Sequence, residues 1–175
     1  MKKIRKVAIV GAPGSGKTTL SYKLQEIFKL PICHIDSIHQ LPNWVLRETS
    51  ERDRMILEET KKDEWIMDGT FTDTLEERVK VADIIIFLDY PTIVSLMGVF
   101  KRLATRLGKE KPDMPGCKEK FDLSFIIYVA GYNKERRKYI VEILEKYKDR
   151  NIKVFKKRKE LKKWLKELEE STNND

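Results

Sequence analysis

Eight residues near the N-terminus, GAPGSGKT at 11–18, have the types and spacing that suit phosphate binding. The three glycines allow backbone N–H groups to converge on phosphate oxygens, because no Cβ stands in the way. A helix predicted to begin directly afterwards adds the positive end of its dipole. Lys17 offers a positive charge to the β and γ phosphates, and Thr18 offers a hydroxyl ligand for Mg²⁺. We therefore expect ATP and Mg²⁺ as cofactors, held by Gly11, Ala12, Pro13, Gly14, Ser15, Gly16, Lys17, Thr18 and Thr19.

Two aspartates follow apolar runs and compete for the metal side of such a site. Asp68 ends the run in WIMDGTF, residues 65–71, and Asp89 follows IIIFL at 84–88. In open α/β sheets, ligands bind at the carboxyl ends of strands. Either aspartate could hold a Mg²⁺-bound water, and the other would then be an ordinary turn former.

The stretch HIDSIHQLPNW, residues 34–44, holds both histidines of the chain. A zinc site is disfavoured, because His34 and His39 are five residues apart and no third ligand of the right type is near. We expect a strand to end here and a loop to enter the acceptor side, with His34 packed in the strand. Asp36 would orient or deprotonate an acceptor hydroxyl. His39, Trp44 and Gly69 are further substrate-binding candidates; Trp44 either closes an apolar patch or stacks on a flat substrate.

Two pairs of arginines bracket a Lys-, Pro- and Gly-rich segment, GKEKPDMPGCKEK at 108–120. This segment shows no apolar face, and it is either a surface loop or a mobile lid at about 108–121. Arg102 and Arg106 precede it on one helix face, and Arg136 and Arg137 follow it. Phosphoryl transfer requires cations around the developing charge, so these arginines are catalytic candidates. The alternative is that they are ordinary solvated surface residues.

Apolar runs alternate with helical patterns along the chain, which favours βαβ units and a parallel sheet. The runs lack in/out alternation, as expected for strands that are covered on both faces. We predict a three-layer α/β/α sandwich with a five-stranded parallel sheet in one domain, 1–175. The predicted strands are Lys6–Val10, Ile32–Ile35, Trp65–Met67, Ile84–Leu88 and Ile152–Phe155, and the predicted helices span 17–29, 49–62, 73–80, 91–108, 122–147 and 158–169.

Composition narrows the partners and the compartment. The chain has 175 residues and a net charge of +8, which suits phosphate-rich partners such as nucleotides or nucleic acid. Much of the excess lies at 134–175, where mixed signs and helical patterning favour a solvated helix face. Two unrelated cysteines, Cys33 and Cys117, argue against a disulfide framework. The N-terminal apolar run is too short for a signal peptide, and no stretch has membrane-spanning length, so we expect a cytoplasmic protein.

The absence of certain sequence motifs argues against some classes of nucleotide-binding protein. A GTPase would carry an N-K-x-D motif, but the only Asn-Lys pair, Asn133–Lys134, continues as Glu-Arg. The chain is also short for a motor ATPase. A small nucleotide or metabolite kinase remains. The alternative is an ATP-binding regulatory module with a nucleic-acid or protein partner, which only the basic tail supports; the oligomeric state is not predicted.

The chain resembles the adenylate-kinase-like P-loop kinases, and among them the bacterial DNA topology modulation proteins. The resemblance rests on GAPGSGKTTL, HIDSIHQLPNW, WIMDGTF, ADIIIFLDYP, KRLATR, PGCKEKFD and GYNKERR. It implies a nucleoside-monophosphate-kinase-like fold and transfer of the ATP γ-phosphate to a small acceptor. No motif indicates a nucleophilic tyrosine or a DNA-binding helix pair.

The resemblance also implies individual roles. Asp68 would be the acid on the Mg²⁺ side, in preference to Asp89. Arg102 would lie against the ATP with Arg106 nearer the phosphates, and Arg136 and Arg137 are similar to the arginines that follow the lid. Thr70 and Phe71 replace the expected Pro-Arg. The arginine that would hold an acceptor phosphate is therefore missing, which weighs against AMP.

Overall fold

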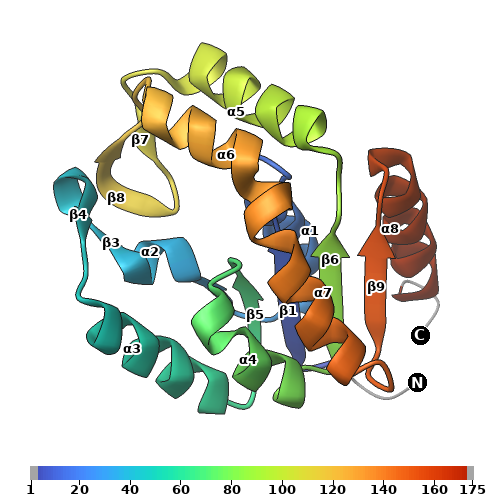
Figure 1. Cartoon of the computed structure of the whole chain (residues 1–175). Helices are drawn as coiled ribbons and strands as arrows, with labels where there is room; N and C mark the ends of the chain where they lie inside the picture. Colours follow the sequence, from blue (N-terminus) through green and yellow to red (C-terminus); the bar gives the residue numbers. More distant parts are fainter. Residues whose placement is uncertain (1–3, 173–175) are drawn as a thin grey trace.

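The computed structural model describes residues 4–172; residues 1–3 and 173–175, at the two ends of the expected 1–175 domain, lie outside this range. Its centre is a five-stranded sheet in the order β2-β5-β1-β6-β9, with all neighbours parallel. This confirms the expected parallel sheet (Figure 1). The strands are β1 Lys6–Gly11, β2 Ile32–His34, β5 Trp65–Asp68, β6 Ile84–Leu88 and β9 Ile152–Phe155.

Helices cover both faces of the sheet, which makes three layers (Figure 1). Alternate residues of β1 enter opposite cores, as the two-residue period of a strand requires. Val7 and Ile9 pack with α1 and α8, while Ala8 and Val10 pack with α3, α4 and α7. The bounds of these helices are α1 Lys17–Phe28, α3 Thr49–Lys61, α4 Leu75–Val81, α7 Arg137–Lys146 and α8 Arg158–Thr172. Within residues 4–172, no helix has the length and hydropathy needed to cross a bilayer.

The strand order brings the candidate residues to one edge. β1 lies in the middle of the sheet, with β2 and β5 on one side of it and β6 and β9 on the other. The segment after β1 therefore begins at the point where the strand order changes direction. Parallel strands end at the same edge of a sheet, and the crevice beyond those ends is where open α/β sheets bind ligands. Gly11, His34 and Asp68 end their strands here, and Asp89 follows β6.

Asp36 does not lie at a strand end, contrary to our expectation. β2 stops at His34, and Asp36 lies in the first turn of the short helix α2, Ile35–His39. The Ser37 hydroxyl donates to the His34 carbonyl at 2.7 Å, a local bond that favours the turn over a continued strand. The chain then forms a small hairpin, with β3 Gln40–Leu41, a 3₁₀ turn Pro42–Trp44 and β4 Val45–Leu46.

The segment 108–120 is also more ordered than its composition predicts. It forms a second hairpin, β7 Glu110–Lys111 and β8 Met114–Lys118, after helix α5, Thr92–Arg106. The expectation that it has no apolar face is wrong, because Met114 and Cys117 are buried. Two apolar residues are too few to produce a recognisable hydrophobic pattern in the sequence. In the structure, however, they give the hairpin one buried face.

The helix predicted over 122–147 is two helices, α6 Leu123–Glu135 and α7, with the break at Arg136. Tertiary contacts hold the chain on both sides of the break. The Asn133 amide donates to the Tyr90 carbonyl at 3.0 Å, and Arg137 forms an ion pair with Asp89 at 2.7 Å. These contacts let α6 follow the lid region while α7 covers the sheet (Figure 1). A 3₁₀ turn, Thr72–Thr74, precedes α4.

Candidate active site

The phosphate-binding loop connects β1 to α1, as the sequence predicts. The helix begins at Lys17 directly after Gly16, whose φ of 98° requires glycine. The half-buried Lys17 side chain curls back over the loop, and its ammonium donates to the carbonyls of Gly11 and Ala12 at 2.9 and 3.1 Å. These bonds fix the loop shape and hold the charge above it. Thr18 and Thr19 occupy the first turn of α1 beside it.

The loop fits a polyphosphate by its donors as well as its shape. Gly16 provides no side-chain cap to α1, and the first turn of this helix contains no acidic residue. The first N–H groups of the helix are therefore available to an anion. The Ser15 hydroxyl is buried with no hydrogen-bond partner among the described residues. The donor set thus fits the oxygens of a polyphosphate.

Two glycines allow the phosphate-binding loop to pack closely against helix α5. Gly14 has φ 79°, and a Cβ there would collide with the Ser95 carbonyl of α5. A Cβ on Gly98, in the same helix, would collide with the Gly14 carbonyl. A glycine in the middle of an amphipathic helix needs a packing reason, so Gly98 could have been found from the sequence.

Gly98→Ala is expected to destabilise the fold by about 1–3 kcal/mol and to weaken nucleotide binding, because the added methyl group displaces the loop. Gly131→Ala is the matched control, since its Cβ would meet only the Glu135 carboxylate, the end of a flexible side chain, at 3.3 Å. This second change should stabilise α6 by up to about 1 kcal/mol. Thermal unfolding and titration with a non-hydrolysable ATP analogue measure both effects; equal behaviour of the two variants would contradict the packing argument.

Asp68 lies in a hydrogen-bonded cluster next to the loop, whereas Asp89 does not. The buried Asp68 carboxylate accepts a bond from the Ser21 hydroxyl of α1 at 3.0 Å. Its other oxygen lies 2.7 Å from Nδ1 of His34. Asp89 instead forms a two-bond ion pair with Arg137, at 2.7 and 2.8 Å. Of the two aspartates, the geometry brings Asp68 to α1.

The His34–Asp68 contact predicts a pH-dependent stability. Burial disfavours the His34 imidazolium, but the bond and charge of Asp68 outweigh it and hold the pKa of His34 above its ordinary value of 6.5. A raised pKa adds stability that is complete below about pH 6.5 and is lost as the pH rises through the folded-state value. Urea unfolding of the metal-free protein should show this loss on the alkaline side, and His34→Gln should remove it. An unchanged pH profile in that variant would refute the assignment.

Lys17, Asp36 and Asp68 lie on three different elements and interact through their charges. Burial lowers the pKa of Lys17, and the carboxylates of Asp36 and Asp68 partly counteract this effect. The Asp36 side chain is half-buried and, within residues 4–172, makes no side-chain hydrogen bond or ion pair. The Lys17 ammonium is thus influenced by two carboxylates, and one of them, Asp36, is available to a ligand.

A buried arginine shapes the turn after β5. Arg78 of α4 is fully buried and donates to the carbonyls of Gly69 and Phe71, both at 2.8 Å. Gly69 has φ 137°, and a Cβ there would come within 2.8 Å of the Ile35 Cβ. The Thr70 hydroxyl accepts from the Gly11 N–H at 2.9 Å and donates to the Gly11 carbonyl at 2.7 Å. The turn at 69–71 is therefore joined to the phosphate-binding loop.

His39 faces this same turn. Its ring packs edge-on against Phe71, with 4.9 Å between centroids, and the Arg52 guanidinium lies over the same phenyl ring at 5.0 Å. Burial, and next the charge of Arg52, lower the pKa of His39. The imidazole is thereby favoured in its neutral form, which can both donate and accept a hydrogen bond.

Trp44 joins the two small hairpins. Its indole N–H donates to the Lys118 carbonyl at 2.9 Å, and Lys111 and Lys120 lie over its ring at 5.5 and 5.9 Å. Lys111, on the β7–β8 hairpin, is also among the charges that lower the pKa of Lys17, after burial and Arg102. Trp44 thus attaches the β7–β8 hairpin to the β3–β4 hairpin.

Trp44→Phe should loosen this attachment, because it removes the indole bond but keeps an aromatic ring. One hydrogen bond contributes about 1 kcal/mol, so amide hydrogen exchange at 110–118 should accelerate about fivefold. Exchange in β1 and β6 is the internal control and should not change. Unchanged exchange in the hairpin would show that Trp44 does not hold it.

The four candidate arginines differ in their partners. Arg102 lies 3.0 Å from the buried Glu119 carboxylate at the base of the hairpin, and Arg137 is paired with Asp89. Arg106 and Arg136 are exposed and have no carboxylate partner among the described residues. Arg106 ends α5, and Arg136 lies at the α6–α7 break. The structure thus leaves one unpaired arginine on each side of the lid.

Comparison with solved structures identifies the fold. The chain matches shikimate kinase from Acinetobacter baumannii, solved in complex with shikimate, with a TM-score of 0.61 and 16% sequence identity. The match covers 90% of this chain and 86% of that one. The chain has a P-loop kinase fold. No family model and no curated protein matches the sequence, so the finer resemblance to the topology modulation proteins gains no support.

Within this P-loop kinase fold, several site residues escaped sequence reasoning. Arg78 could have been found, because it interrupts the apolar face of Leu75, Val79 and Ala82 in its helix. His34 was expected only to pack, and its bond to Asp68 carried no sequence signal. The same holds for Thr70, whose contact depends on how the strands are ordered in the sheet.

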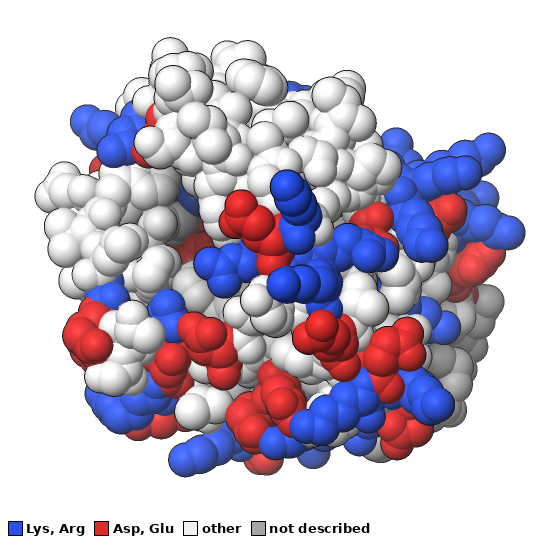
Figure 2. Space-filling model, viewed as in Figure 1, with Lys and Arg blue, Asp and Glu red and all other residues white. Residues whose placement is uncertain are grey.

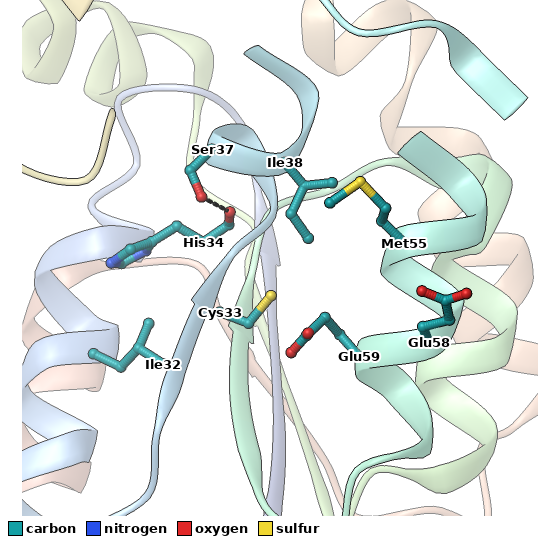
Figure 3. Close-up of a pocket in the computed structure, with 8 residues that line it drawn as sticks. All are labelled: Ile32, Cys33, His34, Ser37, Ile38, Met55, Glu58 and Glu59. Atoms are coloured by element: carbon teal, nitrogen blue, oxygen red, sulfur yellow. Dashed lines mark hydrogen bonds between the residues drawn. The ribbon is translucent and has the colours of Figure 1, made fainter. Parts of the chain in front are cut away.

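A pocket of about 320 Å³ lies between β2 and α3 (Figure 3). Burial is the main cause that raises the pKa of the Cys33 thiol to about 12, so this group is protonated at neutral pH. A protonated thiol is a poor nucleophile and a poor metal ligand. The lining residues are Ile32, Cys33, His34, Ser37, Ile38, Met55, Glu58 and Glu59.

In the part of the chain that the structure describes, no three His, Cys, Asp or Glu side chains group as a metal site. A Mg²⁺ ion bound with a nucleotide does not need such a group. It keeps several waters and uses one or two protein ligands together with phosphate oxygens.

Proposed function

We propose that the protein is an ATP-dependent phosphotransferase that acts on a small hydroxyl-bearing acceptor. The observation that carries this proposal is the phosphate-binding loop, in which the Lys17 ammonium is held at the start of α1 and is acted on by the charges of Asp36 and Asp68. Such an arrangement provides one cation for the transferred group and two acids for different tasks. The P-loop kinase fold supports it.

ATP and Mg²⁺ would be held by residues 11–19, with Thr18 and Asp68 on the metal side. Bound Mg²⁺ supplies charge neutralisation between the β and γ phosphates. The loop N–H groups orient the triphosphate, and Ser21 and His34 orient the Asp68 carboxylate. Lys17 stabilises the charge that develops on the transferred group.

The acceptor would bind between α2, the turn at 69–71 and the hairpin contact at Trp44. The uncommitted Asp36 carboxylate accepts the hydroxyl proton, and neutral His39 offers a hydrogen bond. Gly69 allows close approach, since its missing side chain keeps the turn narrow. Thr70 and Phe71 stand where an acceptor-phosphate arginine is expected, so we favour a non-nucleotide acceptor over AMP.

The arginines would surround the reacting phosphoryl group once the lid closes. Arg106 and Arg136 are unpaired and can take phosphate oxygens directly. Arg102 and Arg137 must first leave, or share, their carboxylate partners Glu119 and Asp89. Closure would also exclude water from the transfer.

The test is ADP release by the purified protein with MgATP and a panel of nucleotides and hydroxylated metabolites, shikimate included. We expect one acceptor class to raise ADP release well above the rate with water alone. Calorimetric titration with the ATP analogue separates the two parts of the proposal. Absence of nucleotide binding would overturn all of it, whereas binding without turnover on any acceptor would overturn the phosphotransferase.

No observation favours the alternative of a regulatory module on nucleic acid. The basic tail contains α7, β9 and α8, and α8 carries ion pairs between residues four apart, Lys163–Glu167 and Lys166–Glu170. Such paired charges are typical of a solvated helix. Use of ATP and two free cysteines suit a reducing compartment, and we propose the cytoplasm.

A further inference from the structure

The helices on either side of the lid share a large uncharged surface. On α5, Ile93, Met97 and Phe100 recur at a spacing of four and three residues, and Leu107 continues the row after the helix ends. On α6, Leu123 and Ile127 form a second row. All six side chains are between 50% and 64% exposed. Helical spacing puts each row on one face, and we call these six residues the α5–α6 face.

The two rows lie on neighbouring helices. α5 and α6 run side by side and pack against each other, with the Arg102 guanidinium of α5 lying 5.8 Å from the Phe125 ring of α6 (Figure 1). Inner residues of both helices, Val99 and Val129, are buried. In the space-filling view, the part of the surface over α5 and α6 is mostly white, while the charges gather over the middle and lower parts (Figure 2).

The size of this face reaches the upper end of what an isolated monomer usually exposes. A large side chain that is half exposed leaves on the order of 100 Å² accessible, so six leave on the order of 600 Å². The largest apolar patch on a typical monomer is about 300–600 Å², and a standard interface buries about 800 Å² per partner. The six residues alone therefore provide most of the area that a stable dimer needs.

We propose that the α5–α6 face binds the same face of a second copy of this chain, which makes the protein a symmetric dimer. The charge distribution selects this occupant. Each chain carries a net charge of +8, so two copies repel unless they meet through an uncharged surface. A partner that recognises charge would use other surfaces. Two-fold dimers join identical patches, so an uncharged face on each copy can be covered by the same face of the other.

The test is sedimentation velocity of the full-length protein over a concentration series up to the order of 100 µM, well above the Kd of a micromolar dimer. We expect a species of about twice the 20.7 kDa of one chain. Met97→Glu and Ile127→Glu, made separately, should each weaken self-association by about 100-fold, since a buried unpaired carboxylate would meet its own copy across the axis.

Tyr139→Glu is the matched control, because Tyr139 is a helical, 44% exposed aromatic residue on α7, outside the face. This variant should remain dimeric, and thermal unfolding should show that all three variants fold. A wild-type protein that stays monomeric overturns the proposal. This holds even if the α5–α6 face is found to bind a different protein. Dimers that persist equally in Met97→Glu and Ile127→Glu overturn it as well, because they would use another surface.

Discussion

Lys17→Ala is expected to lower turnover by about 10³-fold or more. A single positioned donor at a developing negative charge contributes about 10²–10³, and a charged donor contributes more than a neutral one. Two losses add here. The variant lacks the cation for the transferred group, and it also lacks the bonds that tie the helix start to the Gly11 and Ala12 carbonyls. Asp36 and Asp68 would then repel the triphosphate without opposition.

This result is measured as ADP release with MgATP, together with the affinity for the ATP analogue. Lys23→Ala provides the control, since Lys23 is an exposed lysine of the same helix and lies outside the proposed site. It should retain wild-type turnover. If Lys17→Ala kept full phosphotransfer activity while remaining folded, the proposed catalytic site would be wrong.

The sheet was predictable because its signals are local. Each of the five strands is a short apolar run bounded by turn residues, and parallel strands need no partner-specific pattern. The phosphate-binding loop was predictable for a related reason, as all of its requirements lie within eight consecutive residues. Glycines, lysine and threonine must stand in order, and no tertiary contact is needed to recognise them.

The elements that differ are those that tertiary contacts decide. Nothing in KEKPDMPGCKEK shows that Met114 and Cys117 face inward, because their burial depends on the β3–β4 hairpin, and the Cys117 thiol donates to the Leu41 carbonyl at 3.4 Å. The break between α6 and α7 depends in the same way on Asp89 and Tyr90. Helical periodicity continues through Arg136, so the sequence predicts one helix where the fold needs two.

On the acceptor side, too, the positions of single residues depend on tertiary structure and could not be predicted from the sequence. Asp36 was singled out for its type, but its position follows from α2, which the sequence reading missed. The helix leaves the Asp36 carboxylate, whose charge acts on Lys17, without a partner among the described residues. A carboxylate that the fold leaves uncommitted is a better candidate for proton transfer than one already bonded on both oxygens, as Asp68 is.

Asp36→Asn therefore tests the acceptor side, and we expect it to lower turnover by about 10²–10⁴-fold, the usual contribution of a general base. The amide keeps the shape and the hydrogen-bonding reach of the carboxylate but cannot accept the hydroxyl proton. Affinity for the ATP analogue should be unchanged or higher, because one negative charge near the triphosphate is removed. Turnover is measured with the acceptor that the panel identifies, and nucleotide binding is measured separately.

Asp63→Asn is the control, since Asp63 is an exposed aspartate between α3 and β5, and it should leave both quantities unchanged. Asp68→Asn supplies the contrast: if Asp68 acts on the metal side, its loss should raise the Mg²⁺ concentration needed for activity, an effect that Asp36→Asn should not show. Two acids near one lysine would then be separated by what each variant changes, proton transfer for Asp36 and metal dependence for Asp68. Wild-type turnover in Asp36→Asn would remove Asp36 from the chemistry and leave it a positioning role at most.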